Sequence, residues 1–462
     1  MAVRVLLIQT PSVEGLAREK VYPIGLAALA THLKKAGHAV ELLDMNIETD
    51  PFGAVKDRLL GRRPEVVGLS LRNIDPLANK TSSLVPPFVA TARLVAALLP
   101  RAWIVAGGTG FSLFPQRLMG ELPEIHYGIV GEAETSLPAL LGSLDSPPDL
   151  KGLCYRRGAK VLVNPPATGY DMTRYEVPSR EFLSPGLYEE INNYVPAVGI
   201  ETKRGCPLHC TYCVYPRLQG KKLRCRQPAG VVDEMEFLHK EYGVKDFHFN
   251  DPVVNIPCGH LEEICREVLR RKIRIAWSGF FREDHLDEGN VGLFEEAGCN
   301  CFSFSPDGLC EESLRILGKN LGVGDILKAA GLAAATDVVA MYHFMVNVPG
   351  ESGETIAKGL RLLDRLYELH SAKRNLGTVV LNNIRILPGT PLAETAGREG
   401  VIRPETDLLY PVYYNPPPYE TLRYRLEAYH LQRNVFMWQK VREANENTLA
   451  GASAPSGRGA VQ

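Results

Sequence analysis

Three closely spaced cysteines are the residues of this 462-residue chain whose types and spacing most clearly predict chemistry. Cys206, Cys210 and Cys213 follow the pattern C-x-x-x-C-x-x-C, directly after an apolar, strand-like stretch at residues 198–202. Three thiolates on one tight loop can bind three irons of a cubane iron–sulfur cluster and leave the fourth iron without a protein ligand. The spacing therefore predicts a cluster whose open iron can bind a small molecule.

A structural zinc site is the alternative interpretation of these cysteines. Such a site is normally closed by a fourth nearby Cys or His. His209 lies inside the loop and Cys225 follows at a distance, so each could supply that fourth ligand. The spacing favours the cluster but leaves zinc open.

The loop resembles that of the radical S-adenosylmethionine (SAM) superfamily, in which the open iron binds the amino and carboxylate groups of SAM. Tyr212, directly before the third cysteine, also fits the family pattern, and we expect it to act with the catalytic residues. The resemblance implies that one electron passes from the cluster to SAM and releases a 5′-deoxyadenosyl radical. It also implies an external electron donor such as flavodoxin or ferredoxin.

The composition is that of a soluble globular protein, with 45% hydrophobic and 23% charged residues, and the length predicts several domains. The formal net charge of −1 argues against a nucleic-acid partner, which would require a basic excess. No apolar stretch reaches the roughly twenty residues of a membrane span, and the N-terminus carries no signal-peptide pattern. We therefore expect a cytoplasmic protein whose ten cysteines are ligands or buried thiols.

The periodicity of apolar residues divides the chain into two α/β parts. Strand-like and helical stretches alternate over residues 1–150, which predicts a doubly wound, Rossmann-like parallel sheet. After a turn-rich connection at residues 151–196, strand and helix patterns alternate again over residues 197–389, and by resemblance these form the partial (β/α)6 barrel of the radical SAM family. We expect a helical capping region at residues 390–444 and a disordered tail at 445–462.

The first part resembles the B12-binding domain that precedes many radical SAM domains. The segments that carry this resemblance are, in order, Tyr22-Pro23-Ile24-Gly25-Leu26, Ala36-Gly37-His38, Asp44, Gly107-Gly108-Thr109-Gly110-Phe111-Ser112, Phe114-Pro115 and Gly131-Glu132-Ala133-Glu134. In an open α/β sheet ligands bind beyond the carboxyl ends of the strands, and glycines let a bulky ligand approach the backbone. A Rossmann-like fold without cobalamin is the alternative.

The resemblance implies that cobalamin is a cofactor of this part of the chain. We assign to its binding Tyr22, Gly25, Arg72, Asn73, Gly107, Gly108, Gly110, Ser112, Gly131 and Glu132. Among these, we expect Gly107, Gly108 and Gly110 to admit the nucleotide tail.

One departure from other B12 proteins concerns the ligand of cobalt. The D-x-H-x-x-G motif of methionine-synthase-like proteins is absent after the first strand, where Gln9-Thr10-Pro11-Ser12 stands, so we expect no histidine ligand from this loop. By resemblance to the tryptophan 2-methyltransferase branch, Arg72 lies under the cobalt without binding it. A cation there would favour the electron-rich cob(I) form. The alternative is that Arg72 forms an ordinary ion pair with Asp75 or Asp44.

If the cysteines hold the cluster, SAM lies across the carboxyl ends of the barrel strands, where loops build the sites of such folds. The candidate contacts at these strand ends are Asn250, Asp251, Arg282, Ser305, Asp307 and Asn347. The Asp251 carboxylate suits the cationic amine of SAM, and Arg282 suits its carboxylate. Asn347 lies in a segment that resembles the adenine-side segment of the family, where a glycine is usual. Several of these residues also occur commonly in turns.

Cobalamin and SAM in one chain imply, by resemblance, a radical SAM methyltransferase. It would move a methyl group from SAM via methylcobalamin to an unactivated carbon of a small-molecule or peptide-derived substrate. If the resemblance at Arg72 holds, a non-radical variant is also allowed. The alternatives are a cobalamin-dependent rearrangement or cyclisation enzyme and a non-catalytic cobalamin or iron–sulfur sensor. Among the remaining cysteines, we expect Cys258, Cys265, Cys299, Cys301 and Cys310 to pack in the core.

Overall fold

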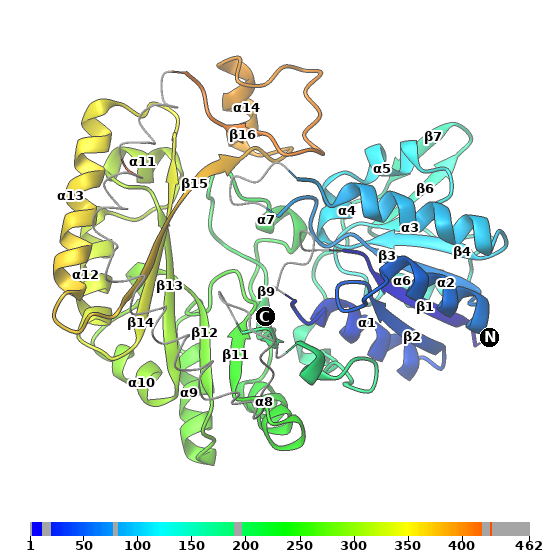
Figure 1. Cartoon of the computed structure of the whole chain (residues 1–462), viewed down its shortest axis with the longest axis horizontal. Helices are drawn as coiled ribbons and strands as arrows, with labels where there is room; N and C mark the ends of the chain where they lie inside the picture. Colours follow the sequence, from blue (N-terminus) through cyan, green and yellow to red (C-terminus); the bar gives the residue numbers. More distant parts are fainter. Residues whose placement is uncertain (1, 12–19, 77–81, 189–195, 418–425, 427–462) are drawn as a thin grey trace, which may run out of the picture.

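The computed structural model describes residues 2–11, 20–76, 82–188, 196–417 and 426, which form two α/β domains (Figure 1). Each domain is built on one seven-stranded sheet. Within the described residues, no helix combines the length and apolarity that a membrane span requires.

The sheet of the first domain has the strand order β2-β1-β3-β4-β5-β6-β7. Its parallel strands are β1 (Arg4–Gln9), β2 (Ala39–Asp44), β3 (Val66–Ser70), β4 (Trp103–Gly107) and β5 (Tyr127–Ile129). An antiparallel hairpin, β6 (Leu153–Arg157) and β7 (Lys160–Val163), extends it. The hairpin corrects the predicted boundary at residue 150, because the sheet of the first domain continues to Val163.

Helices cover both faces of this sheet because alternate strand residues point to opposite sides. Leu6 and Ile8 of β1 pack toward α2 and α3, whereas Val5 and Leu7 pack toward α1 and α6. The helices are α1 (Ile24–Lys35), α2 (Pro51–Arg62), α3 (Val85–Leu98), α4 (Thr109–Leu113), α5 (Pro115–Glu121) and α6 (Ser136–Leu141). The predicted doubly wound domain is confirmed.

The second domain is an open, curved sheet with β8 and β16 at its edges. Its parallel strands are β8 (Gly199–Ile200), β11 (Asp246–Phe249), β12 (Ala276–Phe281), β13 (Cys299–Asp307), β14 (Val339–Val346) and β15 (Leu376–Arg385). The short strand β16 (Tyr413–Tyr414) pairs antiparallel with β15. Six parallel strands in an open arrangement match the predicted partial barrel.

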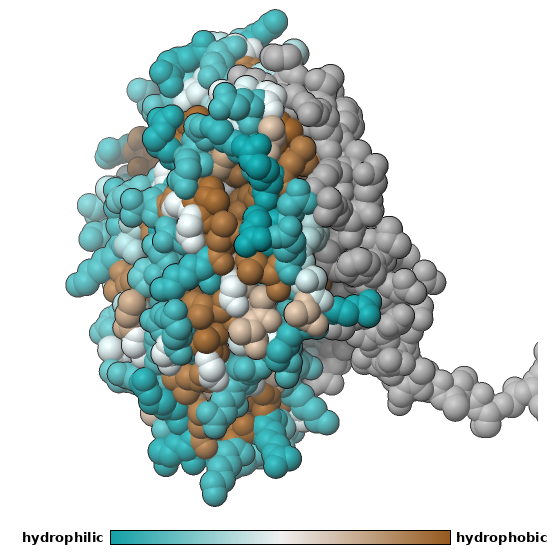
Figure 2. All heavy atoms as spheres, turned by 90° about the vertical axis from the view of Figure 1, so that its left-hand side faces the viewer, coloured by the Kyte–Doolittle hydropathy of each residue, from teal (hydrophilic) through white to brown (hydrophobic). Residues whose placement is uncertain are grey.

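Helices pack against the outer side of this sheet. Along β13 and β14, Phe302, Phe304, Tyr342 and Phe344 point outward into the core beneath the helices. The helices are α8 (Pro228–Tyr242), α9 (His260–Arg271), α10 (Val291–Glu296), α11 (Glu311–Ile316), α12 (Val323–Ala334) and α13 (Gly353–His370). Figure 2 shows the face on the α12 and α13 side, where hydrophilic side chains surround scattered apolar ones.

Short elements connect the two domains. They are the 3₁₀ helices Met172–Arg174 and Pro185–Tyr188, the hairpin β9 (Lys203–Arg204) and β10 (Arg224–Cys225), and the helix α7 (Tyr215–Leu218). A further 3₁₀ helix, Glu283–His285, follows β12, and α14 (Pro391–Arg398) lies in the predicted capping region. The predicted C-terminal helix and the tail at 445–462 lie outside the described residues.

Candidate cofactor site between the two domains

A cavity of about 310 Å³ lies where the parallel strands of the first domain end. Three neighbouring strands of the sheet, β1, β3 and β4, contribute their last residues to the wall of the cavity. These residues are Gln9, Ser70 and Gly107. The opposite wall comes from the second domain, with Glu201, Arg204, Tyr215, Gln219 and Asn250. The site is therefore closed only when both domains are present.

The inner part of the cavity is apolar. It is lined by Leu7, Leu29, Val105, Ile129 and Leu137, which belong to the core between the sheet and helices α1 and α6. Gly68 also lines it, and a Cβ at this position would lie 2.6 Å from Leu7 Cδ2. An apolar slot that ends in polar walls fits a cofactor with an aromatic tail and many amide groups, as cobalamin has.

Most residues that we assigned to cobalamin line this cavity. They are Tyr22, Gly25, Arg72, Gly107, Gly108, Ser112, Gly131 and Glu132. Asn73 is exposed and lies outside the lining. Gly110 also lies outside it, because it packs against the neighbouring loop, where a Cβ would lie 3.0 Å from the Leu71 carbonyl oxygen. Gly110 is therefore needed for packing against this loop, and its part in admitting the nucleotide tail stays a prediction.

Arg72 faces the cavity, and the two predicted ion-pair partners are engaged elsewhere. Asp75 accepts a hydrogen bond of 2.8 Å from Arg385 Nε, and Asp44 accepts one of 2.7 Å from the Tyr188 hydroxyl. No carboxylate among the described residues forms an ion pair with Arg72. Burial lowers the pKa of Arg72, while Tyr215 and Asp44 act in the opposite direction.

The three cysteines lie on the loop between β9 and α7. Backbone hydrogen bonds hold this loop, from Cys206 N to the Gly220 oxygen at 3.0 Å and from Thr211 N to the Leu317 oxygen at 2.9 Å. Gly205 has φ +92°, and a Cβ there would lie 2.2 Å from the Lys222 oxygen, so the sharp entry to the loop requires glycine.

The thiols are set close enough to influence one another. Burial is the main cause that raises the pKa of Cys213 to about 12, and the neighbouring thiols of Cys210 and Cys206 contribute in the same direction. Burial also raises the pKa of Cys206. The thiols of Cys206 and Cys213 therefore hold their protons at neutral pH, and metal binding must displace them. In the described part of the chain, no three His, Cys, Asp or Glu side chains converge on one metal ion.

Tyr212 anchors the cysteine loop to the barrel. Its hydroxyl donates to Asp307 Oδ2, which also forms an ion pair of 2.7 Å with Lys319 Nζ. Burial raises the pKa of Tyr212 well above its usual range, and Asp307 adds to this effect. Tyr212 and Asp307 are thus engaged with each other and hold the loop in place, and their roles in catalysis and SAM binding stay predictions.

Two other residues predicted to contact SAM, Asp251 and Arg282, form hydrogen bonds and ion pairs with other residues of the chain. Asp251 accepts hydrogen bonds from Thr202 N at 2.8 Å and Lys203 N at 3.1 Å, and its carboxylate lies 3.6 Å from Lys203 Nζ. Arg282 forms an ion pair of 2.7 Å with Asp284 and donates to the Asn320 oxygen. These pairings fix the orientation of both side chains, and their contact with SAM stays a prediction.

The remaining candidates stay predictions. Asn250 lines the interdomain cavity, and Ser305 is half-buried, with its carbonyl accepting from Lys319. Asn347 has φ +56° and is fully buried; its Oδ1 lacks a hydrogen-bond partner among the described residues. Of the cysteines expected in the core, Cys258 is exposed and Cys301 only half-buried, which corrects that expectation for both.

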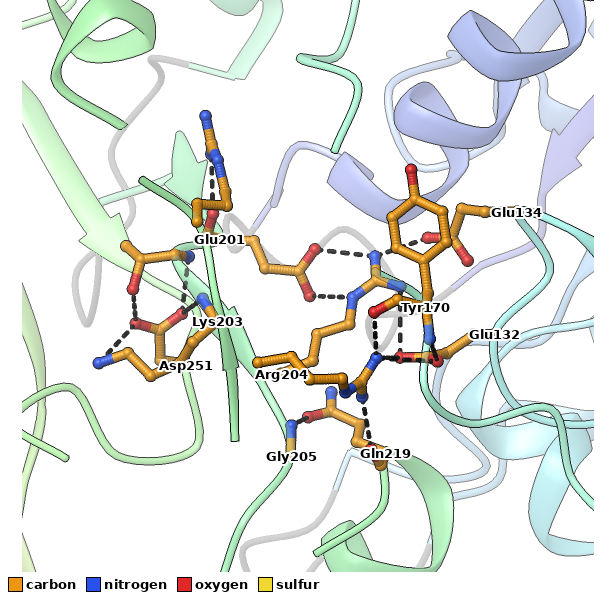
Figure 3. A network of polar contacts seen from close by, with 12 residues as sticks. Glu132, Glu134, Tyr170, Glu201, Lys203, Arg204, Gly205, Gln219 and Asp251 are labelled. Atoms are coloured by element: carbon orange, nitrogen blue, oxygen red, sulfur yellow. Dashed lines mark hydrogen bonds and ion pairs between the residues drawn. The ribbon is translucent and has the colours of Figure 1, made fainter. Parts of the chain in front are cut away.

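Sequence reasoning missed a buried ion-pair network on the cavity wall (Figure 3). Arg204 contacts Glu134 and Glu201, and Arg224 contacts Glu132. The available signal was the position of Arg204, two residues before the first cysteine and next to a strand end.

Two family models match the chain. The B12 binding domain model matches residues 15–141, and the radical SAM superfamily model matches residues 200–363. An uncharacterized methyltransferase from Pyrococcus horikoshii is 24% identical over 86% of this chain and 84% of its own. A tryptophan 2-C-methyltransferase from Streptomyces laurentii is 25% identical over 82% of this chain and 72% of its own.

A solved structure shares this fold. The radical SAM methyltransferase TsrM from Kitasatospora setae, which has cobalamin and a [4Fe-4S] cluster bound, superposes with a TM-score of 0.72 at 24% identity. The match covers 87% of this chain and 79% of TsrM. With a B12-binding domain, a radical SAM domain and a cavity between them, the chain belongs to the cobalamin-dependent radical SAM enzymes, whose cofactors are cobalamin, SAM and a [4Fe-4S] cluster.

Proposed function

We propose that this protein is a methyltransferase that moves a methyl group from SAM, by way of cobalamin, to a carbon atom of a small-molecule or peptide-derived substrate. The observation that carries the proposal is the cavity between the domains, with Arg72 on one wall and Tyr215 and Gln219, which follow the cysteine loop, on the other. The relatives named as methyltransferases support the same reaction class.

The chain's own residues would prepare the two cofactors for this reaction. The apolar slot around Leu7 and Val105 would take the nucleotide tail, and Cys206, Cys210 and Cys213 would hold the cluster beside the cavity. Cobalamin carries methyl groups on cobalt, and a cluster with an open iron can reduce SAM. The protein positions these groups and excludes water.

Arg72 favours a second, non-radical form of the reaction. Its guanidinium lines the cavity, and a buried cation beside cobalt would stabilise electron-rich cobalt without binding to it. In that form SAM serves only as the methyl donor to cobalt, and an electron-rich substrate takes the methyl group. An external electron donor, such as a flavodoxin or ferredoxin, would supply reducing equivalents in either form.

The decisive experiment is anaerobic reconstitution with iron, sulfide and cobalamin, followed by addition of methyl-labelled SAM and reductant. S-adenosylhomocysteine together with 5′-deoxyadenosine would support radical methyl transfer, and S-adenosylhomocysteine alone would support the non-radical form. 5′-Deoxyadenosine without any loss of the labelled methyl group would favour a rearrangement or cyclisation enzyme. The absence of both products would contradict an enzymatic role and favour a sensor.

A further inference from the structure

Arg204 binds carboxylates from both domains at once. Its Nε and Nη2 each lie 2.9 Å from an oxygen of Glu201, which follows β8 of the barrel. The same Nη2 lies 2.6 Å from Glu134, and Nη1 lies 3.5 Å from Glu132. Glu132 and Glu134 follow β5 of the first domain, and the Arg204 side chain is only 7% exposed. One guanidinium thus connects the two walls of the cavity.

A second arginine strengthens this connection. Arg224 lies directly opposite Arg204 in the hairpin of β9 and β10. Its Nη1 is 2.8 Å from Glu132 and donates to the Tyr170 carbonyl at 2.7 Å. The Tyr170 amide in turn donates to Glu132 at 2.8 Å (Figure 3). The arrangement places two buried carboxylates and the partly buried carboxylate of Glu201 around two guanidinium groups.

The network continues into both ends of the cysteine loop. Arg204 is followed by Gly205 and Cys206, and the Gly205 amide donates to Gln219 Oε1 at 3.3 Å. Arg224 Nη2 donates to the Gln219 carbonyl at 2.6 Å. The segments before and after the three cysteines are therefore attached to the same pair of arginines.

The chemistry of the network makes it stiff. A guanidinium is planar and presents its donors in a fixed fork, so two carboxylates bound to one arginine are held at a defined angle. Removing one partner by mutation would leave the other charge buried and unpaired, which is strongly destabilising, so each member of the network is needed by the others. Glu132, Glu134, Glu201 and Arg204 also line the cavity, so the same contacts border the cobalamin site.

We propose that Arg204 is a positioning residue that fixes the separation between the cysteine loop and the cobalamin cavity. The proposal rests on the two cofactors of the family and does not depend on which reaction they perform. Replacing the guanidinium with a point charge, or removing its partner across the interface, would let the cluster shift relative to the corrin.

Magnetic interaction between the two cofactors tests this separation directly. The full chain is reconstituted with cluster and cob(II)alamin, and the cob(II)alamin EPR signal is compared with the cluster oxidised and reduced. The reduced cluster is paramagnetic, and the dipolar broadening it causes falls steeply with distance. The variants are Arg204→Lys and Glu134→Gln, and the control is Arg156→Lys, whose contacts with Ile125 and Leu122 remain inside the first domain.

We expect both variants to retain iron and cobalamin per chain but to show a changed broadening, while the control shows the broadening of the unchanged protein. Unchanged broadening in loaded Arg204→Lys and Glu134→Gln would overturn the proposal. If Arg204→Lys does not retain both cofactors, Glu134→Gln decides by the same criterion. Absence of methyl transfer in the unchanged protein would contradict the proposed reaction, whereas a changed broadening in the variants would still support the positioning role, because the EPR readout requires no turnover.

Discussion

Arg385 of β15 forms a buried ion pair with Asp75 of the first domain, with Nε and Oδ2 2.8 Å apart and side chains 5% and 0% exposed. The same guanidinium donates to the carbonyls of Leu408 and Tyr410. Asp75 belongs to the segment that begins with Arg72 after β3, so the last parallel strand of the barrel supports the loop on which Arg72 lies.

Asp75→Asn should therefore destabilise the protein strongly. Removing one partner of a buried ion pair typically costs about 3–5 kcal/mol, because the remaining charge stays buried. The matched control is Glu65→Gln, since Glu65 pairs with Arg4 at the surface, where both side chains are about half exposed. That change should cost about 0–1 kcal/mol. Urea unfolding of the apo-protein measures both, and equal losses would contradict the structural role of the Asp75 pair.

Filling the cavity should weaken cobalamin binding without unfolding the domain. A Cβ at Gly107 meets only the Ile129 carbonyl at 3.8 Å, so Gly107→Val can be accommodated while its methyl groups enter the cavity. We expect at least about a tenfold rise in the dissociation constant, which corresponds to about 1.4 kcal/mol. Equilibrium dialysis with cobalamin measures it. Gly120→Val on α5, where a Cβ has open space outside the cavity, should bind normally.

The three cysteines of the loop should differ sharply from the other thiols in iron binding. Cys213→Ser removes one of the thiols expected to hold the cluster, and iron content after anaerobic reconstitution should fall well below that of the unchanged protein. Cys258→Ser alters an exposed thiol that contacts His285 Nδ1 at 3.2 Å, on a different loop. Iron content should stay unchanged in that variant. Equal iron losses from both would argue against the assigned ligand set.

Stability should decline as pH rises from about 4.5 to about 7, in part through Glu351. Burial raises the pKa of Glu351 to about 7, so the folded state holds a proton that the unfolded state has released. The stabilising effect is fully present below the unfolded pKa and is lost as pH passes the folded pKa, with a limiting slope of about 1.4 kcal/mol per pH unit.

Glu351→Gln should flatten this decline, because an amide does not titrate. The fold should be retained, since the amide oxygen can still accept the hydrogen bond from Asn347 N, which is 3.0 Å long in the native protein. Glu354→Gln, three residues further on at an exposed position, should leave the profile as it is. Chemical denaturation at several pH values compares the variants. A decline of equal slope in Glu351→Gln would exclude Glu351 as its source.

The regular patterns of the sequence were sufficient to predict both domains. Alternating strand and helix signals indicated the two parallel sheets, and the spacing of Cys206, Cys210 and Cys213 indicated one continuous loop. Glycines gave a less reliable signal, because Gly107 borders the cavity whereas Gly110 is small to let Leu71 approach. A sequence does not distinguish these two causes.

Charged residues at strand ends were the least predictable part of the site. Asp251 and Arg282 have the right charges and positions to meet SAM, yet each forms an ion pair within the chain, at 3.6 Å and 2.7 Å respectively. The partners of Asp251 and Arg282 are Lys203 and Asp284, and nothing in the sequence pattern marks these residues as partners. For the same reason the partners of Arg204, which come from residues 132, 134 and 201, could not be inferred.

The helix α7 follows the cysteine loop, and its Leu218 is part of the hydrophobic core of the first domain. Because domains generally fold as units, N-terminal first during synthesis, we expect the core of the first domain to be in place when Leu218 packs onto it. The loop thus reaches its final shape on a domain that is already folded. Iron–sulfur assembly factors would accordingly find an ordered acceptor only after the two domains have docked.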